Sequence, residues 1–131
     1  MFRLTLSAFS AVALVACPTA PVAPLPTEIA TYIDPDVTRP AEAAHFHYVS
    51  TVQHALAGDR QALLTLVEFS PRLASSPSGA EFHGGVLAQL YERLGPGSFR
   101  EVFARASPQS RESSIALMRA MSYHPDAIQL R

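Results

Sequence analysis

Cysteine is almost absent from this chain of 131 residues, which has a single one at position 17. One thiol excludes an internal disulfide and leaves no cysteine cluster for a structural zinc site. Lysine and asparagine are missing altogether, whereas arginine occurs ten times. Because lysine and asparagine have AT-rich codons, their absence indicates a GC-rich genome, and the arginines are no sign of a nucleic-acid partner.

Neither sign of charge is in excess. The formal net charge is −1, and within residues 41–131 eight arginines balance eight acidic residues. A domain that binds nucleic acid is expected to present a basic excess, and anionic lipid attracts a polybasic stretch. The sequence has neither, so we expect no nucleic-acid partner.

Long apolar runs are also missing, apart from a short one at the N-terminus. Residues 4–16 are apolar except for one threonine and two serines, and Arg3 precedes them. A membrane-spanning helix needs roughly 20 apolar residues, whereas a run of this length is typical of a signal-peptide core. Prolines from Pro18 onward stop a helix from continuing. We therefore expect residues 1–16 to be a cleaved signal peptide.

The cysteine lies directly after this run, in the sequence Leu14-Val15-Ala16-Cys17. This stretch resembles the lipobox of bacterial lipoproteins. The resemblance implies cleavage between Ala16 and Cys17, a diacylglyceryl group on the Cys17 sulfur, and usually a third acyl chain. Two or more chains anchor a protein stably to a membrane. The resemblance also implies an extracytoplasmic address, and Pro18 in place of aspartate favours the outer membrane or cell surface over the inner membrane.

A second cleavage remains open. Small residues in an A-x-A-like arrangement also suit the peptidase that releases soluble proteins, and Ala11-Val12-Ala13 or Ala16 supplies them. Cys17 would then be a thiol near a soluble N-terminus, exposed to oxidation. The position of the sole cysteine at the end of the apolar run favours lipidation.

Residues 17–40 are predicted to be the lipidated N-terminus and a proline-rich tether. From residue 18 to 40 this segment holds six of the eleven prolines and a net charge of −2. Fully extended, it would reach up to roughly 70 Å. Alternatively, the i, i+3, i+4 spacing of Ile29, Tyr32 and Ile33 predicts a short helical turn that docks on the domain. The sequence leaves both open.

Residues 41–131 are predicted to form an all-α domain of about five short helices. Apolar spacing and capping residues indicate them, and no segment has the pattern of a strand. Helices joined by loops of this length form a compact bundle or stacked α-hairpins. The predicted helices cover 40–57, 60–69, 78–94, a short segment from 98, and 107–122.

A partial internal similarity suggests a repeat. The pattern Ala-x-Phe-His occurs at 44–47 and again at 80–83, an offset close to known helical-repeat periods. On a helical wheel, however, His47 falls on a polar side and His83 on an apolar side. True repeats bury equivalent positions, so the wheel argues against a repeat.

The histidines are not spaced for metal binding. His45 and His47 are two residues apart, which directs them to nearly opposite sides of a helix. His47 and His54 share a face but lie about 10.5 Å apart along the helix axis. The i, i+4 histidine pair of helical metal sites is absent. We therefore expect no metal site and no cofactor.

Two single residues are candidates for ligand binding or a protein contact. His83 lies within an apolar helix face, where a histidine usually bonds to a carbonyl or side chain and has no further role. The alternative is a ligand pocket near His83, Tyr91, Met118 and Met121. Phe46 falls on the polar side of its predicted helix, so it marks either a partner surface or a place where another segment packs.

Sequence motifs of catalysis are absent. The chain lacks G-x-S-x-G, S-x-x-K and a phosphate-binding P-loop. Its acidic residues are spread singly, and Glu68 with Arg72 and Glu101 with Arg105 have the spacing of i, i+4 helix pairs. We therefore expect no enzyme but a membrane-anchored lipoprotein that binds an envelope protein or a second copy of itself. The alternative is a carrier or sensor of a small molecule or metal, with its pocket near His83.

Overall fold

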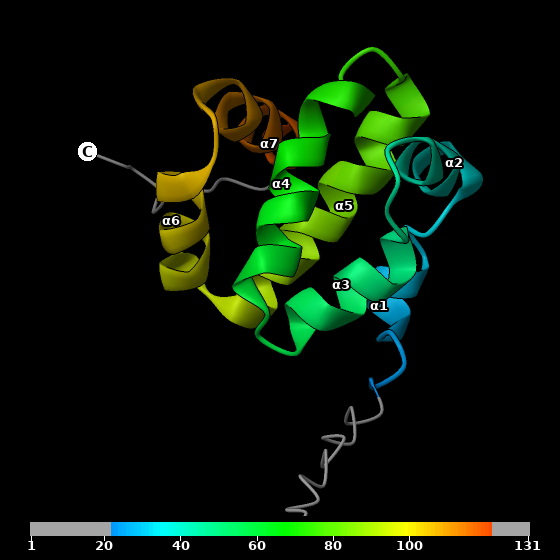
Figure 1. The fold of residues 1–131 in the computed structure, drawn as a ribbon. Coiled ribbons are helices and arrows are strands. Elements are labelled where there is room, and N and C mark those ends of the chain that lie inside the picture. The colour runs from blue at the N-terminus through cyan, green and yellow to red at the C-terminus, as the bar shows by residue number, and fades with distance from the viewer. Residues whose placement is uncertain (1–21, 122–131) are drawn as a thin grey trace, which may run out of the picture.

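The computed structural model describes residues 22–121, and within them the chain is all helical, with no strand (Figure 1). The predicted all-α class is confirmed, but the expected count of about five helices is wrong, because this part of the chain has seven. The signal peptide, the cleavage after Ala16 and the lipidation of Cys17 lie outside the described residues. The helices are α1 (Thr27–Ala30), α2 (Pro35–Ala43), α3 (Tyr48–Leu56), α4 (Arg60–Leu73), α5 (Pro77–Leu94), α6 (Pro96–Arg105) and α7 (Pro108–Ala120).

The predicted helix 40–57 is in fact two helices, α2 and α3. The chain leaves the helical conformation at His45, which has a φ of 66°. His47 then caps α3, and its Nδ1 accepts a hydrogen bond from the Ser50 backbone N–H at 3.3 Å. The repeat is not supported by this geometry, since Phe46 and His47 precede a helix whereas residues 82 and 83 lie inside one.

Residues 27–40 pack on the helices that follow them, although the composition predicts a tether up to residue 40. Ile29 and Val37 have no exposed surface. Asp34 caps α2 by accepting a hydrogen bond from the Asp36 backbone N–H at 2.9 Å, and Pro35 follows at the first helical position, which suits proline. The docked helical turn is therefore the alternative that the structure contains, and helices begin well before residue 41.

Helix boundaries differ from the predictions where two start signals compete. Helix α5 begins at Pro77 after Ser76, whose hydroxyl caps it, and not at residue 78. Helix α6 begins at Pro96 directly after Gly95. Helix α7 begins as predicted, with Ser107 as the cap and proline after it. Helix α4 continues through Pro71 to residue 73, beyond the predicted end.

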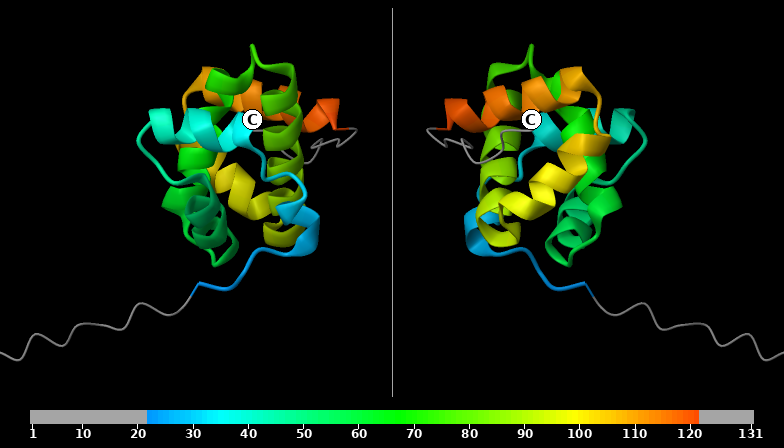
Figure 2. Two further views of the ribbon diagram at one scale, coloured as in Figure 1. Left: turned by 90° about the vertical axis from the view of Figure 1, so that its right-hand side faces the viewer. Right: turned by 90° about the vertical axis from the view of Figure 1, so that its left-hand side faces the viewer.

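The two longest helices, α4 and α5, lie side by side, and the other helices pack around them. Helix α7 crosses both, α3 packs on α4, and α6 contacts α4 and α5 (Figures 1 and 2). Helices α1 and α2 pack on α5. The core between these helices is aliphatic and aromatic, and its largest fully buried hydrophobic side chains are Ile29, Val37, Tyr48, Leu63, Leu66, Leu73, Leu87, Leu90, Phe99, Phe103 and Met118.

Two glycines in α5 set how closely its neighbours approach. A Cβ added to Gly84 would lie 2.6 Å from the Leu117 carbonyl oxygen of α7. A Cβ added to Gly85 would overlap the Tyr32 ring. The glycine pair therefore lets α7 and the segment after α1 pack directly on the α5 backbone. None of the described helices has the length and hydrophobicity to cross a membrane.

Candidate functional site

A chain of buried polar side chains joins four helices. The Tyr48 hydroxyl of α3 lies 2.7 Å from Nδ1 of His83 on α5. The other ring nitrogen, Nε2, lies 3.0 Å from the Leu66 carbonyl oxygen and 3.1 Å from the Ser70 hydroxyl, both on α4. The Ser70 hydroxyl is in turn 2.7 Å from that of Ser114 on α7. The chain thus ties α3, α4, α5 and α7 together at a single point.

The protons in this network follow from the bonding pattern. A carbonyl oxygen only accepts, so Nε2 of His83 carries the proton and donates it to the Leu66 carbonyl. Nδ1 is then the acceptor, and the Tyr48 hydroxyl donates to it. Both ring nitrogens are therefore occupied by groups of the protein itself, as the sequence favours for a buried histidine.

Burial fixes the charge of both rings. Removal from water lowers the pKa of His83 from 6.5 to about 4, against the opposing effect of the hydrogen bond to the Leu66 carbonyl. Removal from water also raises the pKa of the Tyr48 hydroxyl above its ordinary value of 10.0. Both side chains are neutral at pH 7. His83 has no exposed surface, so a ligand would reach its ring only by displacing these bonds.

Pro71 explains why hydroxyls are needed here. Within a helix, the backbone N–H at position 71 would donate to the Val67 carbonyl, but proline has no N–H. The Ser114 hydroxyl donates to the Val67 carbonyl in its place, at 3.3 Å. The network therefore satisfies the backbone of α4 at the turn that the proline interrupts, which is a structural role.

Phe46 lies in the link between α2 and α3, not on a helix as the sequence predicted. Its ring meets the Phe69 ring edge to face, with centroids 4.9 Å apart, and it remains half-buried. Phe46 therefore packs against another segment of the chain, and it also keeps part of its ring at the surface. One side of the ring packs on α4, and another side lines a surface groove.

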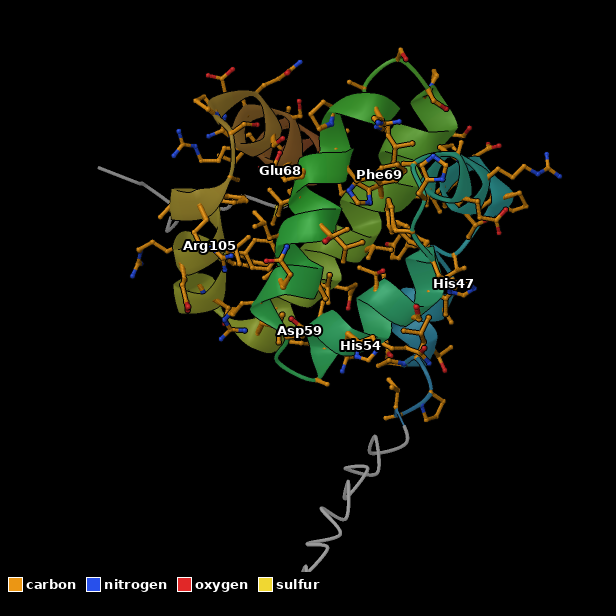
Figure 3. The ribbon with its side chains drawn as sticks, in the orientation of Figure 1. His47, His54, Asp59, Glu68, Phe69 and Arg105 are labelled. Atoms are coloured by element: carbon orange, nitrogen blue, oxygen red, sulfur yellow. The ribbon has the colours of Figure 1, made fainter. Side chains whose placement is uncertain are left out.

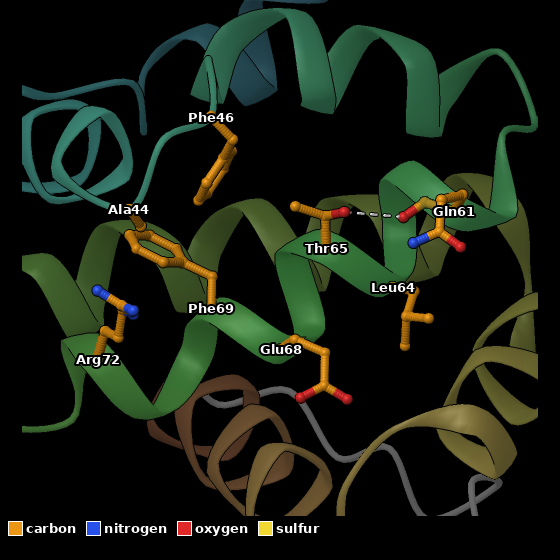
Figure 4. A pocket seen from close by; sticks show the side chains of 8 residues that line it. All are labelled: Ala44, Phe46, Gln61, Leu64, Thr65, Glu68, Phe69 and Arg72. Atoms are coloured by element: carbon orange, nitrogen blue, oxygen red, sulfur yellow. Dashed lines mark hydrogen bonds between the residues drawn. The ribbon is translucent and has the colours of Figure 1, made fainter.

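The groove runs along the outer face of α4 and has a volume of about 280 Å³. Figure 4 shows Phe46 and Phe69 at one side and Leu64 farther along α4. Its lining residues are Ala44, Phe46, Gln61, Leu64, Thr65, Glu68, Phe69 and Arg72. The sequence signalled only Phe46, because the remaining residues come together through the packing of the α2–α3 link on α4.

Glu68 and Arg72 at the groove do not form the ion pair that their i, i+4 spacing predicts. Glu68 turns toward the start of α7 (Figure 3) and accepts hydrogen bonds from the Ser107 backbone N–H at 2.9 Å and the Ser110 hydroxyl at 2.6 Å. These bonds lower the pKa of the Glu68 carboxyl, with that from Ser110 the strongest cause. Within residues 22–121, the Arg72 side chain has neither a hydrogen bond nor an ion pair.

The other predicted pair, Glu101 with Arg105, is also wrong. Glu101 pairs with Arg60 of α4 at 3.4 Å, and Arg105 donates to the Gln61 side chain at 3.1 Å. Both partners lie on α4, so these groups join α6 to α4. Arg105 stands close to one end of the groove, and Arg72 lines the other.

The exposed histidines do not gather. His47 is at the start of α3 and His54 in its last turn, and Figure 3 shows them apart. In the part of the chain that the structure describes, no three histidine, cysteine, aspartate or glutamate side chains are close enough to hold a metal ion.

Comparison with protein-family models, with curated proteins and with solved structures gives no match. The accessible groove on α4 is the candidate site.

Proposed function

We propose that this chain is a bacterial lipoprotein, anchored through acyl chains on Cys17, whose helical domain binds another protein of the cell envelope. The lipobox-like sequence at residues 14–17 supports the anchor. The groove on α4 is the observation that carries the binding function. It combines two aromatic rings, an aliphatic side chain and a guanidinium that has no ion pair within residues 22–121.

The chemistry of the groove selects the kind of segment that it binds. Aromatic residues and arginine are enriched where proteins bind one another, because both contribute large contact areas. Phe46 and Leu64 offer apolar contacts, and Arg72 has no acidic partner within residues 22–121. The complementary segment therefore carries an apolar or aromatic side chain with a carboxylate beside it.

The size of the groove favours a protein segment over an enclosed small molecule. Pockets for drug-sized ligands are roughly 300–1,000 Å³ and bury most of the ligand. A volume of about 280 Å³ beside a half-buried phenylalanine suits one or two side chains of a partner. The polar groups of the groove are engaged by hydrogen bonds within the domain. The Thr65 hydroxyl donates to the Gln61 backbone carbonyl at 3.0 Å, and the Glu68 carboxylate accepts hydrogen bonds from serines at the start of α7. The groove therefore supports binding without catalysis.

Charge reversal tests the groove. Arg72→Glu would repel the acidic segment, and we expect partner recovery by crosslinking in intact membranes to fall roughly tenfold, about 1.4 kcal/mol. Arg39→Glu on α2 is the matched control, because Arg39 is also exposed and has no ion pair among the described residues. Equal recovery with both variants would rule out the groove, and a crosslinked dimer would identify the partner as a second copy.

Replacement of the thiol tests the anchor. We expect the wild-type chain to fractionate with membranes and Cys17→Ser to appear in the soluble extracytoplasmic fraction. A Cys17→Ser protein that stays with the membrane to the wild-type extent would contradict lipidation.

A further inference from the structure

The first described residues are fixed to one end of the domain. The Ala23 carbonyl accepts a hydrogen bond from the Gln53 side chain of α3 at 3.2 Å. Five residues farther along, Glu28 pairs with Arg93 of α5 at 3.3 Å, and Ile29 is fully buried. We call the surface formed by residues 22–28 and the C-terminal turns of α3 and α5 the anchor end. In both views of Figure 2 it lies opposite the turn that joins α4 to α5.

We infer that the anchor end faces the bilayer and that the α4–α5 turn, which contains Ser75, faces away from it. The inference rests on the proposed attachment of acyl chains at Cys17. Its partner is a lipid surface, and its consequence is a fixed orientation of the groove relative to the membrane.

The first reason for this orientation is the short length of chain between Cys17 and the anchor end. Six residue steps separate Cys17 from Ala23, and fully extended they span about 20 Å. A domain of about 100 residues has a radius of gyration of roughly 13 Å, which corresponds to a sphere roughly 33 Å across. For Ser75 to touch the bilayer, the anchor end would have to stand about one domain diameter above it. The chain is too short for that, whereas a free tether up to residue 40 would allow any orientation.

The second reason is the apolar character of the surface at the anchor end. Val22 is 39% exposed, which makes it the most exposed large hydrophobic side chain among the described residues. Pro24, Leu56 and Leu94 line a second hollow of about 290 Å³ beside it. Glu28 and Arg93 form an ion pair there, and Glu92 in the last turn of α5 has no ion pair among the described residues. The apolar and ion-paired part of this surface can approach lipid headgroups at a low desolvation cost.

The groove then lies along the side of the domain. Gln61, at one end of the groove, is in the first turn of α4, near the anchor end, and Arg72 is in the last turn. A partner segment in this groove would extend away from the membrane surface rather than along it.

Single tryptophans test the orientation, because the chain has none of its own. Ala57→Trp places a fluorophore at the anchor end, and Ser75→Trp places one on the far turn; both positions are exposed. The chain from Cys17 onward is coupled through its thiol to a maleimide phospholipid, in vesicles that contain a headgroup-spin-labelled lipid. We expect quenching of the Ala57→Trp fluorescence and little change for Ser75→Trp. Equal quenching, or stronger quenching at position 75, would overturn the inference.

A longer tether provides the control. Inserting about 20 glycine and serine residues after Pro18 adds roughly 25 Å of flexible chain, so the difference between the two tryptophans should shrink. Circular dichroism confirms that each variant is folded. Because the coupling is chemical, this result does not depend on acylation in the cell, which the fractionation of Cys17→Ser decides separately.

Discussion

At Pro71, helix α4 lacks the N–H that would bond to the Val67 carbonyl, and a side chain from another helix supplies the missing donor. The Ser114 hydroxyl reaches that carbonyl, and His83 bonds to the preceding one, at Leu66. The sequence predicted that His83 is buried, because its neighbours on the helix are apolar. It did not predict the partners of His83, since they lie 13 to 35 residues away in sequence, on helices whose relative positions no spacing rule provides.

A double-mutant cycle tests the link between the proline and the serine. Ser114→Ala leaves a buried carbonyl without a donor, and we expect a loss of about 1–3 kcal/mol in the free energy of unfolding in urea. The loss should be smaller when Pro71→Ala restores the backbone N–H. Ser113→Ala, one residue away and half-buried, is the control. Equal losses with and without Pro71 would show that Ser114 does not serve the Val67 carbonyl.

The depressed pKa of His83 predicts acid sensitivity. The folded state holds this pKa at about 4, against 6.5 for an unperturbed histidine. The unfolded chain therefore gains a proton as the pH falls below 6.5, while the folded chain does not, and stability decreases until the pH reaches about 4. The full loss approaches about 3 kcal/mol.

The pH dependence of urea unfolding checks this effect. A His83→Gln variant, although less stable at pH 7, should lose less stability between pH 6.5 and 4 than the wild type. Parallel pH profiles for the two proteins would mean that His83 is not the group responsible.

Helices with regular apolar spacing and a clear capping residue could be predicted from the sequence. Helices that form only because they pack on another part of the fold could not. Helix α7 begins where Ser107 and the following proline indicate. The sequence does not predict the break between α2 and α3, because the apolar spacing continues across it and no glycine marks the position where His45 adopts a positive φ. Helix α1 is a single turn that exists through the burial of Ile29 in a distant core.

The close packing of α7 on the glycines of α5 can be tested by substitution. Gly84→Ala would push a methyl group against the α7 backbone, and we expect a loss of about 1–3 kcal/mol in spite of the higher helix propensity of alanine. Gly97→Ala in α6 is the control, because a Cβ there meets no atom within 4 Å. It should be neutral or stabilising in thermal unfolding. Comparable stability of the two variants would refute the close approach of α7 to α5.

For the whole molecule, the main difference from the sequence prediction is where the domain begins. Composition indicated a tether up to residue 40, since prolines usually mark linkers. Three of these prolines instead have positions in the fold: Pro26 precedes α1, Pro35 starts α2, and Pro40 lies within α2. The groove was not predictable as a site, because Phe46 and Leu64 come together only through the fold.

Truncation tests this boundary. A chain that starts at Ala23 keeps every described helix and should unfold at the wild-type temperature. A chain that starts at Asp34 loses Ile29 and Tyr32, whose removal leaves a cavity, and we expect a loss of about 2–5 kcal/mol. Equal melting temperatures for the two truncated chains would mean that residues 27–33 do not contribute to the core.

The single hydrogen bond between Gln53 and the Ala23 carbonyl has a mechanical consequence. A force applied at the N-terminus acts first on this bond, then on Leu25, which packs against the core, and on Pro26, whose carbonyl accepts hydrogen bonds from the backbone of α1. These contacts peel off one at a time, and releasing residues 23–26 lengthens the chain by about 13 Å. Further peeling would pull Ile29 out of the core, so we expect the contacts of residues 23–26 to be lost under load before those of α1.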